Sequence, residues 1–173
     1  MTNTIAYPAL DLLPDLCDLY PNDTQVLTQQ FNDYGEIKIF HGQVVTVKCF
    51  EDNSLVKSTL AQDGRGKVLV VDGGGLTKKA LLGDLIAESA INNNWQGIVI
   101  NGYIRDVATI NALNIGVKAL GTTPIKTEKR GLGDLNIPVS IAGVNINPND
   151  WLYADENGVL IAKHELVLPS PNN

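Results

Sequence analysis

The stretch VLVVDGGGLTKKALLGDLIAESAINNNWQGIVINGYIRD, residues 68–106, decides the fold of this chain. It begins with the apolar, β-branched run 68–71 and nears its end with a second apolar run, 98–100. Short runs without polar residues are typical of strands covered on both faces in a parallel sheet. The triple glycine 73–75 then predicts a turn, so the whole stretch is interpreted as a strand, a turn, a helix and a second strand.

Apolar side chains recur at roughly helical spacing between the two predicted strands, which predicts an amphipathic helix. The residues expected on its core face are Leu82, Leu85, Ile86, Ser89, Ala90 and Trp95. Two parallel strands joined by a helix end on the same edge of the sheet. We therefore expect 72–75 and 102–106 to lie together on the edge where ligands usually bind in open α/β sheets.

Length and composition limit the classes of protein to consider. A chain of 173 residues that is 44% hydrophobic can form one core, so we predict a single domain over residues 1–173. The net charge of -6 argues against a broad basic face and hence against direct nucleic-acid binding. The first residues lack the pattern of a signal peptide, and no apolar run approaches the roughly 20 residues that span a bilayer. We expect a cytoplasmic protein that does not enter a membrane.

Leucines recur at helical spacing within residues 9–20, where Pro14 should mark a helix start or a break. A second short helix is predicted to run through Gln30, capped by Asp23 or Thr24. The apolar stripe of this segment should pack on the domain or on a neighbouring subunit. No chemistry is predicted there.

Together these two predicted helices form an N-terminal helical arm over about residues 1–34. Strict alternation of apolar and polar residues at 45–49 then predicts a strand with one buried face, within 37–50. The acidic pair 51–52 could belong to a metal site or could cap the next predicted helix, 54–62. Capping and helix-dipole complementarity explain the pair better. Because Cys17 and Cys49 form no CxxC pair, neither a zinc site nor a disulfide framework is predicted.

The remaining elements are shorter. They are predicted as a helix at 107–113, a strand at 116–120, an exposed loop at 121–133, strand pieces within 137–146 interrupted by Gly143, and a β-hairpin over 151–161 with Asn-Gly at its turn. Residues 168–173 are predicted to be a disordered tail. Strands without helices on either side of the strand–helix–strand unit favour an α/β fold with mixed β/β/α layers over a doubly wound sheet.

Charged residues gather at the predicted ligand edge. Residues 83–86 open the predicted helix, where free N–H groups and the positive end of the dipole attract an anion. Arg105 and Asp106 directly follow the second strand; a guanidinium matches a carboxylate, and an Asp oxygen suits Mg²⁺ or Mn²⁺. A plain helix cap at Asp84 and a structural Arg–Asp salt bridge are the alternatives. Together, two carboxylates and one guanidinium on one edge favour a site.

Such a site would suit a small, anionic 2-oxo acid. A divalent cation chelated by the carboxylate and adjacent carbonyl of the substrate acts as a Lewis acid while a carbon–carbon bond breaks. Schiff-base chemistry is the rival, with Lys48 or Lys67 as the amine, but snorkelling at strand edges explains both lysines better. His41 and His164 are isolated in the sequence and support neither a metal cluster nor a catalytic triad.

Several motifs resemble the family of the regulator of ribonuclease E activity A (RraA), which also contains the class II 4-hydroxy-4-methyl-2-oxoglutarate aldolases. These motifs are GQVVTVKCFEDN (42–53), GRGKVLVVDGGG (64–75), NNWQGIVINGYIRD (93–106), LNIGVKAL (113–120) and LYADENGVLI (152–161). The resemblance covers nearly the whole chain. It implies the swivelling β/β/α fold, like that of phosphohistidine domains, and a homotrimer with clefts between its subunits.

The aldolases of this family carry an Asp, twenty further residues and then Arg-Asp, and Asp84 stands at the same spacing before Arg105–Asp106. The residues implied to bind substrate are Gly83, Asp84, Leu85, Ile86 and Arg105, the first four through backbone N–H groups. Asp84 and Arg105 would also be catalytic, and Asp106 would hold the divalent metal, Mg²⁺ or Mn²⁺. The implied reaction is retro-aldol cleavage to pyruvate, with oxaloacetate decarboxylation through the same pyruvate enolate.

Other members of the family regulate ribonuclease E by binding it, and KCFEDN and VLVVDGGG are similar to that branch. Two features depart from the aldolase pattern. Thr109 stands where the aldolases have an acidic residue, and the chain stops at Asn173 without their longer C-terminal segment. We interpret the chain as a metal-dependent aldolase, because neither packing nor protein binding explains these charged residues together at the ligand edge. The alternative is an inhibitor of ribonuclease E without catalytic activity.

Overall fold

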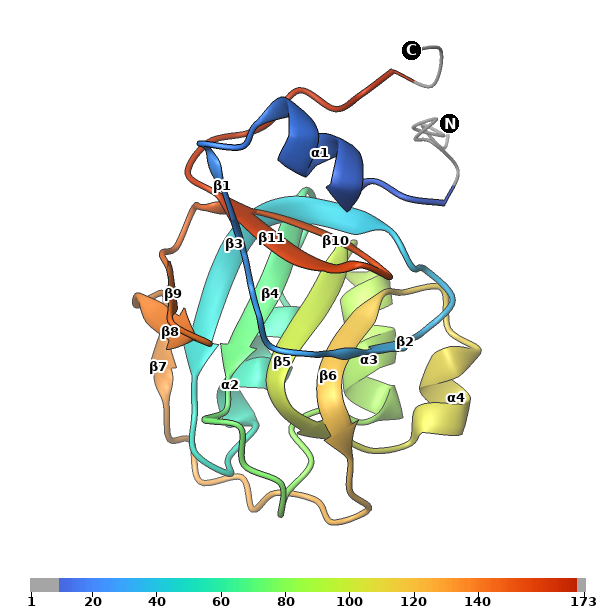
Figure 1. Cartoon of the computed structure of the whole chain (residues 1–173). Coiled ribbons are helices and arrows are strands. Elements are labelled where there is room, and N and C mark those ends of the chain that lie inside the picture. The colour runs from blue at the N-terminus through green and yellow to red at the C-terminus, as the bar shows by residue number, and fades with distance from the viewer. Residues whose placement is uncertain (1–9, 171–173) are drawn as a thin grey trace.

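One nine-stranded sheet forms the centre of the molecule, and its strands follow the order β1-β11-β10-β3-β4-β5-β6-β2, with β7 beside β3 (Figure 1). The structure is a computed structural model that describes residues 10–170. The helices are α1 (Leu13–Leu19), α2 (Ser54–Leu60), α3 (Asp84–Asn92) and α4 (Val107–Asn111). The strands are β1 (Thr24–Val26), β2 (Asn32–Tyr34), β3 (Phe40–Lys48), β4 (Lys67–Asp72), β5 (Gly97–Ile104), β6 (Val117–Thr122), β7 (Asp134–Leu135), β10 (Trp151–Asp155) and β11 (Gly158–Ala162), with β8 (Val139–Ile141) and β9 (Val144–Ile146) in a separate two-stranded sheet.

The middle of the sheet is parallel, as the apolar runs predicted. Strand β4 pairs in parallel with β3 on one side and with β5 on the other, and β5 pairs in parallel with β6. Residues 68–71 and 98–100 are fully buried. Strands covered on both faces have no solvated side and therefore lack the polar alternation of an antiparallel strand.

The two faces of this sheet are covered by different layers. Helices α2, α3 and α4 cover one face, where Val56, Leu60 and Ala87 pack with side chains of the parallel strands. On the other face, β10 and β11 bring Leu152 and Ile161 against the parallel strands, so the sheet folds back over itself. The fold is therefore a mixed α/β single domain with two β layers and one helical layer, and α1 packs outside on β10 and β11.

The N-terminal segment differs from the prediction. Helix α1 begins at Leu13, with Pro14 in its first turn, as expected for a proline that marks a helix start. It packs on the domain, as expected, and Leu13 and Leu16 are buried. The prediction of a second short helix is wrong. Thr24–Val26 is strand β1, which pairs with β11, and Asn32–Tyr34 is strand β2, which pairs with β6. Local helix signals were overridden because β11 and β6 offered unpaired edges that these short segments complete. Residues 1–9 of the predicted arm lie outside the described residues.

Helix α3 departs from its predicted core face at one residue, Leu85. Leu85 is 74% exposed, whereas Ala87 and Ala90 are buried. The pattern misplaced Leu85 because the helix begins only at Asp84, so Leu82 belongs to the preceding loop and is buried there. Of the other residues predicted for the core face, Leu82, Ala90 and Trp95 are buried and Ile86 packs against the core, as predicted.

The other predicted elements are confirmed: α2, α4, β6, the β8 and β9 pieces on either side of Gly143, and the β10–β11 hairpin. Both cysteines are free, and burial raises the pKa of the Cys49 thiol to about 12. In the predicted tail, Leu168 packs beside α1, and residues 171–173 lie outside the described residues. None of the helices within residues 10–170 has the length and apolar character needed to cross a membrane.

Candidate active site

Two backbone hydrogen bonds bring the start of α3 to the end of β5. The N–H of Leu81 donates to the carbonyl of Tyr103 at 2.8 Å, and the N–H of Arg105 donates to the carbonyl of Leu82 at 3.0 Å. The loop before α3 therefore runs along the end of β5. As a result, residues separated by some twenty positions in the sequence meet at one edge of the sheet, as predicted.

The carboxylate of Asp106 is the centre of this meeting. Its Oδ2 atom accepts the backbone N–H of Asp84 at 3.2 Å and lies 3.6 Å from Nε of Arg105. The side chains of Arg105 and Asp106 are 37% and 36% exposed, so both remain accessible to a ligand. The structure therefore brings the side chains of Arg105 and Asp106 together with the backbone of Asp84, whose own carboxylate accepts the N–H of Leu85. The ion pair described for Arg105 lies within the site.

The backbone of Asp106 adopts the left-handed conformation, with φ at +57°. This conformation is strained for a residue other than glycine, and such residues occur often at functional sites. Asp106 is also the residue that precedes α4, and its carbonyl accepts the N–H of Ile110 in that helix. The backbone thus sets the direction in which the side chain leaves the chain, and the contacts with Asp84 and Arg105 orient the carboxylate.

Gly83 makes room for this carboxylate. A Cβ atom built on Gly83 would lie 2.7 Å from Oδ2 of Asp106 and 3.4 Å from Nε of Arg105. The φ of Gly83 is −128°, which any residue can adopt, so the requirement for glycine here is one of space. The glycine thus allows the start of α3 to approach the charged pair directly.

The N–H groups at the start of α3 are partly engaged. The N–H of Asp84 donates to Asp106, and that of Leu85 donates to the carboxylate of Asp84 at 2.8 Å. The first helical bond is that of Ala87 to the carbonyl of Gly83. Among the described residues no acceptor is found for the N–H of Ile86, which leaves it for a ligand.

The triple glycine forms a turn that is bound to its neighbour strand. Asp72, which is 7% exposed, accepts the N–H of Gly74 at 2.9 Å and the side-chain amide of Asn101 at 3.1 Å. The N–H of Gly75 donates to the carbonyl of Asn101. Sequence reasoning missed Asn101. The feature of the sequence that could have indicated Asn101 is its polar side chain directly after the apolar run 98–100. In the structure it lies close to a register shift between β5 and β6.

Of the acidic pair after β3, Asp52 is structural and binds the start of α2, as the capping interpretation predicted. Asp52 is buried and accepts the N–H and hydroxyl of Ser54 together with the N–H groups of Arg130 and Leu132. Burial alone would raise the pKa of Asp52, but these hydrogen bonds outweigh it and lower the pKa from 3.8 to about 2. Its lone pairs are used by the protein, so it is no metal ligand.

Asp106 has the chemistry that a hard divalent cation requires. Mg²⁺ is commonly held by one or two carboxylates, with waters and substrate oxygens in the remaining positions. Within residues 10–170 no group of three or more His, Cys, Asp or Glu side chains is arranged to hold a metal ion. A half-exposed carboxylate with one engaged oxygen therefore fits a cation shared with a substrate, and it does not fit a closed, all-protein site. Thr109, which stands where the aldolase pattern has an acidic residue, lies in α4 and is exposed.

Fold and site together define an α/β protein that presents an aspartate, an arginine and a helix start at the carboxyl edge of a parallel sheet. Residues 13–161 match the family model described as "RraA-like: Aldolase/RraA". The chain belongs to this RraA-like aldolase family.

A named relative and two solved structures are similar to this chain over most of its length. The chain is 54% identical, over 92% of its length and 99% of the relative, to a Marinomonas sp. (strain MWYL1) protein named "Putative 4-hydroxy-4-methyl-2-oxoglutarate aldolase". It is similar to a structure described as an S-adenosylmethionine:2-dimethylmenaquinone methyltransferase from Geobacillus kaustophilus HTA426 (TM-score 0.88, 42% identity, 89% of this chain and 96% of that chain). It is also similar to the RNA-processing inhibitor RraA from Thermus thermophilus (TM-score 0.86, 40% identity, 89% and 93%).

Proposed function

We propose that this protein is a divalent-metal-dependent class II aldolase that cleaves 4-hydroxy-4-methyl-2-oxoglutarate into two molecules of pyruvate. Oxaloacetate decarboxylation would be a secondary activity. The observation that carries the proposal is that the Arg105 side chain and the backbone N–H of Asp84 meet at one carboxylate oxygen of Asp106, against a glycine that leaves space for it. The name of the relatives at 54% identity supports the same reaction.

The roles follow from the chemistry of each group. Asp106 would hold Mg²⁺ or Mn²⁺, which when bound supplies a Lewis acid for the 2-oxo group of the substrate. The guanidinium of Arg105 would bind a substrate carboxylate through paired hydrogen bonds. The N–H groups of residues 83–86, and that of Ile86 in particular, would bind substrate oxygens at the positive end of α3.

The bond changes balance without another reactant. Asp84 takes the proton of the C4 hydroxyl group, the C3–C4 bond breaks, and its electron pair becomes the enolate of pyruvate. The C4 fragment leaves as the first pyruvate, and protonation of the enolate at C3 gives the second. With oxaloacetate, loss of carbon dioxide yields the same enolate, so one site serves both reactions.

We further propose the swivelling β/β/α fold and a homotrimeric assembly in the cytoplasm. The two β layers and the helical layer support the fold assignment. Two large exposed apolar side chains, Phe50 and Leu132, border the same pocket, and their burial between subunits would support an assembly. Leu85 at the candidate site is 74% exposed, Phe50 is 70% exposed and Leu132 is 56% exposed.

The reaction is tested by a coupled assay for pyruvate release. The purified protein is incubated with 4-hydroxy-4-methyl-2-oxoglutarate or oxaloacetate, with Mg²⁺ or Mn²⁺, and again after treatment with EDTA. We expect turnover that EDTA abolishes and that added metal restores. Turnover that is equal with and without the chelator would contradict the metal-dependent mechanism.

A second candidate function is inhibition of an RNA-processing enzyme by direct binding. It is favoured by the similarity to RraA from Thermus thermophilus. Titration of ribonuclease E with the protein would measure both the complex and the inhibition. Binding that is unchanged by Asp106→Ala, in a protein without turnover, would support the regulator and contradict the aldolase.

A further inference from the structure

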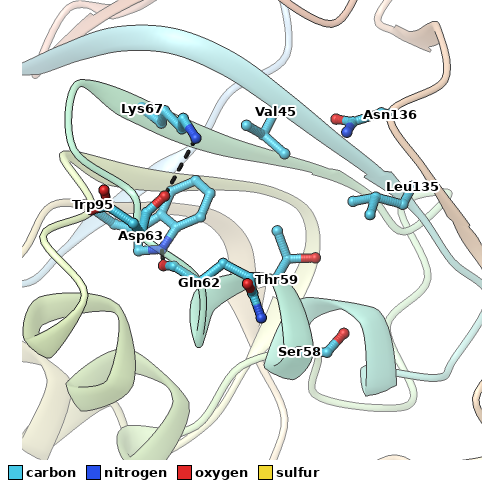
Figure 2. Close-up of a pocket in the computed structure, with 9 residues that line it drawn as sticks. All are labelled: Val45, Ser58, Thr59, Gln62, Asp63, Lys67, Trp95, Leu135 and Asn136. Atoms are coloured by element: carbon cyan, nitrogen blue, oxygen red, sulfur yellow. Dashed lines mark hydrogen bonds between the residues drawn. The ribbon is translucent and has the colours of Figure 1, made fainter.

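A cavity of about 400 Å³ lies between α2 and the strands β3 and β4 (Figure 2). Its lining includes Val45, Thr59, Lys67, Trp95 and Leu135. None of its lining residues belongs to the candidate active site. Trp95 follows the C-terminal end of α3, whereas the candidate site surrounds the first residues of that helix. The volume is that of a small-molecule pocket.

The apolar wall of this cavity is fixed in place. The indole of Trp95 is 7% exposed, packs closely on Gly64 and donates its N–H to the carbonyl of Gln62 at 3.0 Å. Val45 and Leu135 add aliphatic surface. The cavity is therefore bordered by a fixed indole ring and by aliphatic side chains that would contact the hydrocarbon part of a ligand.

Thr59 places an unsatisfied hydroxyl group in the same wall. The residue is 7% exposed, and its Oγ1 atom has no hydrogen-bond partner among the described residues. A helical threonine can donate to the carbonyl four positions earlier, but the carbonyl of Leu55 accepts the hydroxyl of Ser58. A buried hydroxyl without a partner is destabilising, and valine would fill the same volume without it. A hydroxyl or carbonyl group of a ligand would supply the missing partner.

Lys67 supplies the charge. Its Nζ donates to the backbone carbonyl of Asp63 at the long distance of 3.4 Å, and no carboxylate pairs with it among residues 10–170. The carboxylate of Asp63 is instead bound by Arg65, through its N–H at 3.3 Å and its guanidinium at 3.8 Å. The ammonium group of Lys67 therefore keeps unused donors at the cavity.

We propose that this cavity is a second ligand site, which binds a small monocarboxylic acid with an apolar body. The carboxylate pairs with Lys67, the apolar body contacts Val45, Trp95 and Leu135, and a hydroxyl or carbonyl group of the ligand pairs with Thr59. This second site is independent of the proposed lyase reaction, because its lining contains no residue of the candidate active site.

The test uses 3-phenylpropionate, its para-hydroxylated analogue and the uncharged 3-phenylpropanamide as probes, followed by NMR of the labelled full chain. We expect the indole N–H signal of Trp95 to shift on titration with the acids, while that of Trp151 stays in place as an internal control. The amide should bind about tenfold more weakly, because it lacks the charge-assisted contact. Lys67→Met should weaken the acids by the same factor, whereas Lys57→Met, on α2 outside the cavity lining, should leave them unchanged.

Thr59→Val separates a binding role from a packing role. We expect this variant to fold at least as stably as the wild type and to lose only the extra affinity of the para-hydroxylated acid. Three outcomes would overturn the proposal: no shift of the Trp95 signal at any soluble probe concentration, equal binding of acid and amide, or shifts confined to residues 83–86 and 105–106. The last outcome would mean that the acids bind at the candidate active site instead.

Discussion

Asp52 and Asp106 follow the ends of two parallel strands of the same sheet, yet the protein treats their carboxylates differently. Asp52 is buried and accepts hydrogen bonds from Ser54, Arg130 and Leu132. Asp106 is 36% exposed and accepts one backbone N–H, beside the guanidinium of Arg105. A carboxylate whose lone pairs are all used holds the chain together, whereas one that is partly satisfied and accessible can bind a ligand.

The strain is distributed differently as well. At the first turn the left-handed residue is Glu51, next to the buried aspartate, whereas at the second turn it is Asp106 itself. Strain that falls on the ligand-binding residue is typical of a preorganised site. The comparison therefore predicts that changes at Asp52 affect stability and that changes at Asp106 affect activity.

The largest expected effect is on catalysis. Asp106→Asn should lower kcat/KM for pyruvate release by about 10²–10³-fold, because it removes the charge that would hold the cation. Its thermal unfolding should remain close to that of the wild type, since the side chain is exposed. Asp52→Asn is the matched control and should keep its kcat/KM at temperatures where it is folded. Loss of activity in both variants alike would remove the distinction between the two aspartates.

The second effect is on stability. Asp52→Ala should lower the free energy of unfolding by about 2–4 kcal/mol, because it leaves several buried N–H donors without an acceptor. Urea denaturation of wild type and variant measures the difference. Asp63→Ala, at an exposed position, serves as the control and should change stability by about 0.5 kcal/mol or less. An equal loss in both variants would show that the hydrogen bonds of Asp52 contribute little.

The third effect is a dependence of stability on pH. The pKa of Asp52 is lowered from 3.8 to about 2, so its ionised form stabilises the folded state above pH 3.8. This contribution should be lost as the pH falls from about 4 towards 2. Comparing urea unfolding of the wild type and Asp52→Asn over this range should give a difference that is constant near neutral pH and shrinks in acid. A difference that stays constant down to pH 2 would contradict the lowered pKa.

The smallest effect tests the space beside Asp106. Gly83→Ala would place a Cβ atom 2.7 Å from Oδ2 of Asp106 and should displace the carboxylate. We expect the affinity for Mn²⁺ to fall about tenfold, measured by isothermal titration calorimetry. Gly131→Ala is the control, because nothing lies within 4 Å of its Cβ position, and only its positive φ is strained. Unchanged affinity in Gly83→Ala would indicate that the cation does not depend on this position of Asp106.

The middle of the chain could be predicted because its signals are local. The apolar runs of β4 and β5 have no polar alternation, and this alone indicates strands covered on both faces. The sequence also predicted that Asp84 and Arg105–Asp106 would lie at one edge of the sheet, because parallel strands end on one edge. The misplaced elements are those whose partners lie far away in sequence: β1 pairs with β11, and β2 pairs with β6.

By itself, the sequence determined the parallel core, the edge at which the charged residues gather and the family to which the chain belongs. Each of these conclusions follows from local periodicity or from motifs that can be recognised in the sequence alone. Only the tertiary structure decided that the carboxylate of Asp52 is fully hydrogen-bonded while that of Asp106 is accessible. It also decided that Leu85 faces solvent and that Thr59 and Lys67 border a cavity. These properties depend on hydrogen bonds and contacts between residues far apart in the chain, which no local pattern encodes.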